Sequence, residues 1–302
     1  NAGSVVVTDT SSEAGTDWTC TVSLVSGDTA GAVGFTINAA DPAGHQLAQV
    51  SSVTDGAARL TFDNVVPTLT EVAIASSNGA DEAALDGDTI TLTLTSSEPM
   101  AADPACVLQT GGVATTGADV VVTDTSSGAG TGWTCVYTVS AGDTAGAVSF
   151  TIDGADAAGN ALVQVTETTD SSSMAVDRTA PTLSVVSISS SNTAADVAVA
   201  GDTITVTFTA SEAMAASPTC AFQTGGSGAG SDVVVTDTSS GAGTAWTCAM
   251  VAGDALGVVA FAIDGTDLVG NALMQVAAAT DETTIEVVEG APTLTVVSIS
   301  SS

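Results

Sequence analysis

The sequence predicts an all-β protein in which antiparallel β-sandwich domains follow one another end to end. The prediction rests on a long internal repeat, on strands that alternate apolar residues with threonine, and on Gly- and Asp-rich turns between them. Thr, Ser, Val, Gly and Asp dominate the 302 residues, a mixture that suits short strands and polar turns rather than helices. Hydrophobic residues make up 44% of the chain and aromatic residues only 3%. Each domain can therefore bury a core, and that core must be mainly aliphatic.

The repeat is the strongest of these signals. Its period of about 114 residues is the size of one sandwich domain. Phasing the repeat at its proline predicts the C-terminal part of a repeat at 1–66, complete repeats at 67–180 and 181–291, and the first strand of the next repeat at 292–302. We therefore expect the segment to be a window on a longer polymer. The recurring blocks are Val-Val-Val-Thr-Asp-Thr-Ser-Ser from Val5, Val120 and Val233, Trp-Thr-Cys from Trp18, Trp133 and Trp246, and Pro-Thr-Leu from Pro67, Pro181 and Pro292.

Within each repeat the hydrophobic pattern has a period of two residues. Ile90, Leu92 and Leu94 alternate with threonines, which is typical of an antiparallel strand with one buried face. The alternation breaks between Leu183 and Val186, which predicts a bulge or a change of sheet. About seven or eight such strands in one repeat, with no helical period, predict an immunoglobulin-like sandwich.

The junction between the complete repeats is short. Only Arg178-Thr179-Ala180 separates the last strand of one repeat from Pro181, and a residue before proline has little conformational freedom. We therefore expect the repeats to stack as a stiff rod.

Three motifs resemble the bacterial-type Ig-like repeats of giant extracellular surface and filament proteins. They are Ser-Glu-Pro-Met at 97–100 with its counterpart Ser-Glu-Ala-Met at 211–214, the Asp-x-Ala-Gly-Asn-Ala-Leu turn at 156–162, and the Asp-Arg-Thr-Ala-Pro-Thr junction at 177–182. The first repeat departs from the pattern, with His45 in place of the asparagine of the turn. The resemblance covers the whole chain and implies the fold, whereas the family supplies both spacers and binding tips. The cysteine and tryptophan pattern is more similar to the tandem Ig-like repeats of giant algal or protist surface proteins.

The cysteines predict one disulfide in each complete repeat. Cys106 is expected to bond Cys135, and Cys220 to bond Cys248, while the partner of Cys20 is expected upstream of the segment. Buried free thiols are the alternative. Strand alternation places Trp133 on the same face as Cys135, so we expect the tryptophans to pack on the bridges rather than to form a sugar-binding platform. Stable disulfides place a protein in an extracellular or cell-surface setting.

Acidic turns near the domain ends are the one candidate binding site. No cofactor is required, but oxygen ligands of this kind bind calcium in extracellular proteins. The competing interpretation is a plain strand-to-strand turn closed by glycine and asparagine, and it is favoured by the lack of an aspartate equivalent to Asp177 at the third junction. The candidate ligands are Asp153, Asp156, Asn160, Asp177, Asp264, Asp267 and Asn271.

The charge balance narrows the partners. The chain has 34 acidic residues against two basic ones, Arg59 and Arg178, and a net charge of −32. Such a surface repels phosphate backbones and anionic lipids, so neither nucleic acid nor direct membrane insertion is expected for this segment. No catalytic residue is predicted, because no lysine and only one histidine is present to serve a nucleophile. No Asn-x-Ser/Thr sequon occurs, whereas outward serine and threonine leave O-glycosylation open.

These observations predict a structural protein rather than an enzyme: a stiff shaft within an extracellular filament, appendage or surface sheath, with other copies of the same repeat protein as partners. The alternative is the calcium-stiffened stalk of a giant cell-surface adhesin. A carbohydrate-binding module is a third reading, disfavoured because the repeats are nearly identical where binding modules vary their loops.

Overall fold

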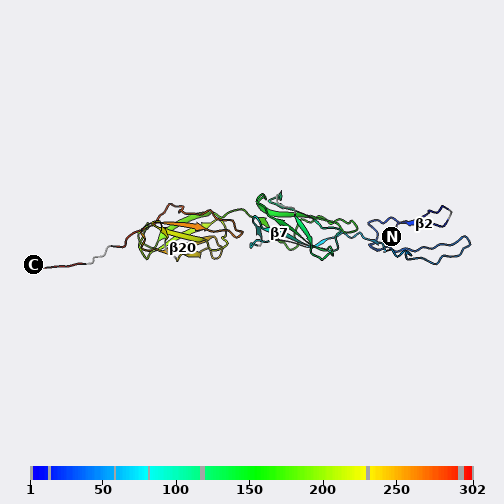
Figure 1. The fold of residues 1–302 in the computed structure, drawn as a ribbon, viewed down its shortest axis with the longest axis horizontal. Helices are drawn as coiled ribbons and strands as arrows, with labels where there is room; N and C mark the ends of the chain where they lie inside the picture. Colours follow the sequence, from blue (N-terminus) through cyan, green and yellow to red (C-terminus); the bar gives the residue numbers. More distant parts are fainter. Residues whose placement is uncertain are drawn as a thin grey trace.

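The computed structural model describes residues 3–12, 15–57, 59–80, 82–115, 120–228, 232–291 and 296–300. Every regular element in these residues is a β-strand. Two complete sandwiches, at 69–176 and 183–287, follow a partly built first unit along one line, as Figure 1 shows. The chain is therefore an end-to-end series of domains.

Each sandwich has one four-stranded antiparallel sheet. The strand order is β10-β11-β7-β5 in the first sandwich and β19-β20-β16-β14 in the second. The strands are β5 (Leu69–Ser76), β7 (Thr89–Ser96), β10 (Val121–Asp124), β11 (Gly132–Thr138), β14 (Leu183–Ser190), β16 (Thr203–Ala210), β19 (Val234–Asp237) and β20 (Ala245–Val251).

The second sheet of each sandwich has five strands, in the orders β6-β13-β12-β8-β9 and β15-β22-β21-β17-β18. Its pairs are antiparallel except that β6 with β13 and β15 with β22 run parallel. The strands are β6 (Ala83–Ala84), β8 (Ala105–Thr110), β9 (Val113–Ala114), β12 (Gly146–Asp153), β13 (Ala175–Val176), β15 (Val197–Ala198), β17 (Thr219–Thr224), β18 (Ser227–Gly228), β21 (Gly257–Asp264) and β22 (Glu286–Val287).

Side-chain alternation explains why these segments pair as strands. In β7 the aliphatic residues Ile90, Leu92 and Leu94 are buried, while the threonines between them lie on the outer side. The register of β14 shifts between Leu183 and Val185, as the broken alternation predicted, and β5 shifts at the equivalent place. The shift lets each strand continue along β16 or β7 while its first residues take another register.

The cores are mainly aliphatic, and each also holds one tryptophan and a few other aromatic residues. Trp133 and Trp246 are buried against their respective cores. In each sandwich a disulfide joins the two sheets: Cys106 of β8 to Cys135 of β11, and Cys220 of β17 to Cys248 of β20.

The described residues of the first unit form the later strands of the repeat. It comprises two pairs, β1 (Val6–Asp9) with β2 (Trp18–Thr21) and β3 (Gly31–Ala32) with β4 (Thr61–Phe62). Trp18 is 57% exposed, whereas its counterpart Trp133 is 1% exposed, because no equivalents of β5 to β9 cover it among the described residues. Cys20 is exposed and forms no disulfide here, so an upstream partner stays a prediction.

The strand expected at 292–302 is not formed in the part of it that the structure describes. Residues 296–300 carry no strand pairing, and Val296 and Ile299 are exposed. The equivalent strand β14 forms by pairing with β16, whereas residues 296–300 lie beside no strand among the described residues. Residues 292–295 and 301–302 lie outside the described residues.

Candidate site at the domain junctions

The two domain junctions are built in the same way. At the first, residues 63–67 connect the first unit to the first sandwich, and at the second, residues 177–181 connect the two sandwiches. Asp177 leaves β13 with its backbone N–H donating to the carbonyl of Ala84, at 3.0 Å. The β6–β13 pairing thus fixes the direction in which the chain enters the junction.

At each junction, a tight turn of the following domain lies against the connecting residues. This turn follows β12 at the first junction and β21 at the second. In the turn from Asp156 to Asn160, one carboxylate oxygen of Asp156 accepts the backbone N–H groups of Ala158 and Asn160, each at 2.9 Å. Gly159 has φ of +92°, a conformation that glycine adopts without steric cost. Asp156 and its counterpart Asp267 are 3% and 2% exposed, so the turn buries its carboxylate.

The asparagine of this turn reaches across to the preceding domain. The Asn160 Nδ2 group donates to the Asp63 carbonyl at 3.3 Å and to Asp156 Oδ2 at 2.8 Å. Asn271 repeats the arrangement, donating to the Asp177 carbonyl at 3.4 Å and to Asp267. One side chain therefore ties the last residue of one domain to the turn of the next at both junctions.

Three carboxylates meet beside each asparagine. Their ligand oxygens lie within 4.8 Å of one another in two groups, Asp63 with Glu98 and Asp156, and Asp177 with Glu212 and Asp267. Glu98 is carried there by the loop after β7, because Met100 forms an isolated β-bridge with Asp156. Met214 and Asp267 form the same bridge in the second sandwich. Each group thus takes one carboxylate from the preceding domain and two from the following one.

Desolvation and this clustering raise the pKa of both glutamates. Desolvation raises the pKa of Glu98, and the nearby carboxylates of Asp63 and Asp156 raise it further. The pKa of Glu212 is raised by desolvation and by Asp267 and Asp177. The pKa of Asp156 is lowered, chiefly by the hydrogen bond from the Asn160 side chain. Glu98 Oε1 is a buried atom with no hydrogen-bond partner among the described residues, so the ionised form of Glu98 gains no hydrogen bond there to offset its desolvation.

The structure divides the predicted ligands into two sets. Asp156, Asn160, Asp177, Asp267 and Asn271 all lie at the junctions.

Asp153 and Asp264 do not belong to either carboxylate group. Asp153 accepts a hydrogen bond from Gln164 at 2.9 Å, and Asp264 accepts one from Gln275 at 2.8 Å. They end their strands, where side chains alternate outward away from the turn, so the expectation that they share a site with Asp156 and Asp267 is corrected.

Sequence reasoning missed Asp63, Glu98 and Glu212. The recurrent Ser-Glu-Pro-Met and Ser-Glu-Ala-Met motifs carried the signal for both glutamates. The partner carboxylates lie far away in sequence, however, and only the isolated β-bridges bring the two loops together.

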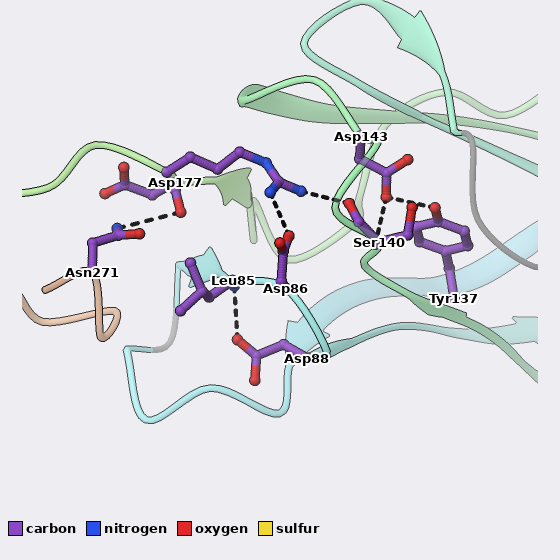
Figure 2. Close-up of polar contacts among 9 residues, drawn as sticks. Leu85, Asp86, Asp88, Tyr137, Ser140, Asp143, Asp177 and Asn271 are labelled. Carbon is purple, nitrogen blue, oxygen red and sulfur yellow. Dashed lines mark hydrogen bonds and ion pairs between the residues drawn. The ribbon is translucent and has the colours of Figure 1, made fainter.

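The second junction has further contacts, some of which Figure 2 shows. Arg178 forms an ion pair with Asp86 at 2.5 Å and donates to the Ser140 carbonyl at 2.6 Å. Across the joint, the Asn78 side chain of the first sandwich donates to the Val269 carbonyl of the second at 3.0 Å. The carboxylate group lies in a hollow of about 300 Å³ between the domains. The joint is therefore an ordered contact between two domains.

The first junction replaces the arginine by a neutral group. Asn64 donates to the carbonyls of Ser26 and Asp28, at 3.0 and 3.1 Å. In the first unit, His45 replaces the bridging asparagine, and its Nδ1 lies 2.8 Å from Asp41 Oδ2. The histidine thus makes the same contact to the turn aspartate that Asn160 makes to Asp156.

The strand order and the end-to-end arrangement define the class of protein: tandem immunoglobulin-like β-sandwich domains. Neither the protein-family models nor the curated proteins gave a match. Among solved structures, the chain is similar to a three-Ig titin fragment in an E-to-A mutated variant, with 9% identity and a TM-score of 0.35 over 74% of this chain and 65% of that one. A titin I-band fragment gives 9% identity and a TM-score of 0.34 over 74% and 66% of the two chains, so this chain spans just under two thirds of both fragments. The N-terminal Ig1-2 module of the Drosophila receptor protein tyrosine phosphatase DLAR gives 10% identity and a TM-score of 0.24 over 75% of this chain and all of that module.

A search of the described residues for a helix with the length and apolar character of a membrane span found none.

Proposed function

We propose that this chain is part of a stiff shaft in an extracellular filament, appendage or surface sheath, and that its role is structural rather than catalytic. The observation that carries the proposal is the repeated joint: Asn160 and Asn271 make the same interdomain contact at two successive junctions. A linker a few residues long combined with a side-chain tie restricts bending far more than a flexible linker does. A shaft needs this geometry at every junction.

The extracellular setting is supported by the two disulfides, which persist in oxidising compartments. Other copies of the repeat protein are the proposed partners, because contacts between identical chains strengthen a shaft.

Calcium is the proposed stiffening ion, and it also supports the alternative function of an adhesin stalk. Each junction offers three carboxylates from two domains within 4.8 Å of one another, and oxygen ligands of this type suit Ca²⁺. A cation there would neutralise the repulsion that raises the pKa of both glutamates and would bond to both domains at once. The site can therefore couple ion binding to stiffness.

Small-angle X-ray scattering of the 302-residue chain tests this proposal. We expect a rod-like distance distribution with a maximum dimension near the sum of the domain lengths, and a further narrowing when calcium is added after chelator treatment. The Asn271→Ala variant should broaden the distribution, because it removes the donor to the Asp177 carbonyl, while Asn192→Ala, at the other end of the same domain, serves as the matched control. A broad distribution in the unmodified chain, with or without calcium, would contradict the shaft proposal. Scattering that is insensitive to calcium would contradict only the calcium proposal.

A further inference from the structure

The outward side of the four-stranded sheet in each sandwich is almost free of charge, although the chain carries a net charge of −32. The registers place one row of small residues, three of them threonines, across the middle of each sheet. In the second sandwich the row is Thr236, Thr247, Thr207 and Ser187. We call this side of the four-stranded sheet, in both sandwiches, the threonine face.

The first sandwich presents the same row as Thr123, Thr134, Thr93 and Ala73. Glu71 is the one charged residue among the outward positions of this sheet, and Thr95 donates a hydrogen bond to it at 2.9 Å. In the second sandwich, Val185 replaces that glutamate. Its threonine face therefore carries no charged side chain at all.

The acidic residues gather elsewhere, at the turns and junctions. The outer side of the five-stranded sheet ends in Asp153 or Asp264, and the junctions hold the carboxylate groups. Two parallel chains of this kind repel each other wherever their domain ends meet. In the second sandwich the threonine face is the side where their approach meets the least local repulsion, because the other sheet carries Asp264 and Glu286. Both threonine faces offer methyl groups for packing and hydroxyl groups for hydrogen bonds.

We propose that the threonine face is the surface through which copies of this chain pack side by side. The proposal rests on the proposed shaft function and names the surface through which its partner copy binds. The occupant is a second copy rather than a different partner, because an uncharged face matches another uncharged face and shields both from the acidic ends.

The area of the threonine face determines how many domains must pack together for a side-by-side contact between two chains to be stable. The four strands of the first sandwich's sheet have 8, 8, 7 and 4 residues, and with a rise of about 3.3 Å per residue and a strand spacing of about 4.8 Å they cover roughly 430 Å². A stable interface buries about 800 Å² on each partner. One domain falls short of this area, and two successive domains exceed it, so lateral packing becomes stable only when several repeats engage together. Repetition along a shaft supplies that condition.

Sedimentation equilibrium of the 302-residue chain tests the proposal. The measurement uses about 1 M NaCl, where the screening length falls to about 3 Å, with chelator present so that cation bridges do not contribute. We expect reversible self-association. The double variant Thr93→Glu, Thr207→Glu should weaken it by about tenfold or more, because a buried, unpaired carboxylate opposes contact. The conservative variant Thr93→Ser, Thr207→Ser should retain it.

The matched control adds the same charge to the other side of each sandwich. Val107→Glu with Ala221→Glu places glutamates at equivalent, exposed positions of β8 and β17, and self-association should persist. Thermal melting of each variant checks that the sandwiches stay folded. Equal weakening by the two double variants, or an unmodified chain that stays monomeric up to millimolar concentration, would overturn the proposal.

Mass spectrometry of the native protein tests whether a glycan, rather than a second copy of the chain, occupies the threonine face. Glycans on Thr93 and Thr207 would show that the face carries sugar, and this too would overturn the proposal. Rod-like scattering together with a monomeric chain would refute the threonine face and leave the shaft function intact. Flexible scattering together with face-dependent association would do the reverse.

Discussion

At the residue scale, Glu212 shows what the junction does to a single side chain. Its carboxylate lies with Asp177 of the preceding domain and Asp267 of its own, and desolvation followed by these two charges raises its pKa. A carboxyl group whose pKa is raised by folding opposes folding when it is ionised. This penalty is absent below the ordinary value of 4.5 and complete once the pH exceeds the raised pKa.

We therefore expect Glu212→Gln to raise the thermal midpoint of the second sandwich at neutral pH in the presence of chelator. The gain should vanish as the pH falls below 4.5, where wild-type Glu212 is also protonated. The same variant should lower calcium affinity by about tenfold or more, since loss of even an outer-shell partner typically costs that much. Calorimetry at several pH values and calcium titration measure the two effects.

Glu286→Gln is the matched control, because it removes one charge from an exposed position of the same domain. An equal gain in this control would attribute the effect to net charge rather than to the junction. A loss of stability in Glu212→Gln would contradict the proposed repulsion.

At the scale of elements, the disulfide between β17 and β20 holds the two sheets of the second sandwich together. Cys248 lies two residues after Trp246 on the buried side of β20, and both belong to the hydrophobic core with Cys220 packed against it. The bridge closes a loop with a sequence separation of 28 residues. On the chain-entropy model, such a loop contributes about 3–4 kcal/mol.

Replacing both cysteines by alanine should therefore lower the free energy of unfolding of the second sandwich by about 3–4 kcal/mol. Urea denaturation followed by the fluorescence of Trp246 measures this change. The transition of the first sandwich, which keeps its own bridge, serves as the internal reference. Cys20→Ala should have no effect on either sandwich, and a comparable loss in that variant would contradict the assignment.

At the scale of the whole molecule, the net charge of −32 determines how the chain responds to salt. Only Arg59 and Arg178 offset the acidic residues, and Arg178 is already paired with Asp86. Like charges destabilise a compact state, and salt screens them.

We expect the thermal midpoints of both sandwiches to rise steadily as NaCl increases to about 1 M, where screening reaches within about 3 Å. Scanning calorimetry with chelator present measures the trend, and an equal osmolality of sucrose separates screening from solute exclusion. Midpoints that fall with NaCl would mean that attractive ion pairs, such as Arg178 with Asp86, outweigh the repulsion.

The predictions from the sequence held where the signal was local. A strand exposes alternate residues to opposite sides, so Ile90, Leu92 and Leu94 identified β7 and its buried side. The break after Leu183 located the register shift, because an extra residue reverses the alternation. The fold of the complete repeats followed from such patterns.

The sequence alone therefore determined the repeat, the sandwich, its aliphatic core and the short junctions, because each is written in patterns that span a few residues or recur at a fixed period. Only the tertiary structure decided which carboxylates meet. Glu98 and Asp156 come from separate loops joined by one β-bridge, and Asp63 comes from another domain. It likewise decided that Asp153 faces Gln164 and that threonines from three neighbouring strands align in one row. Such groupings depend on strand register and domain docking, which bring distant residues together and leave no periodic trace in the chain.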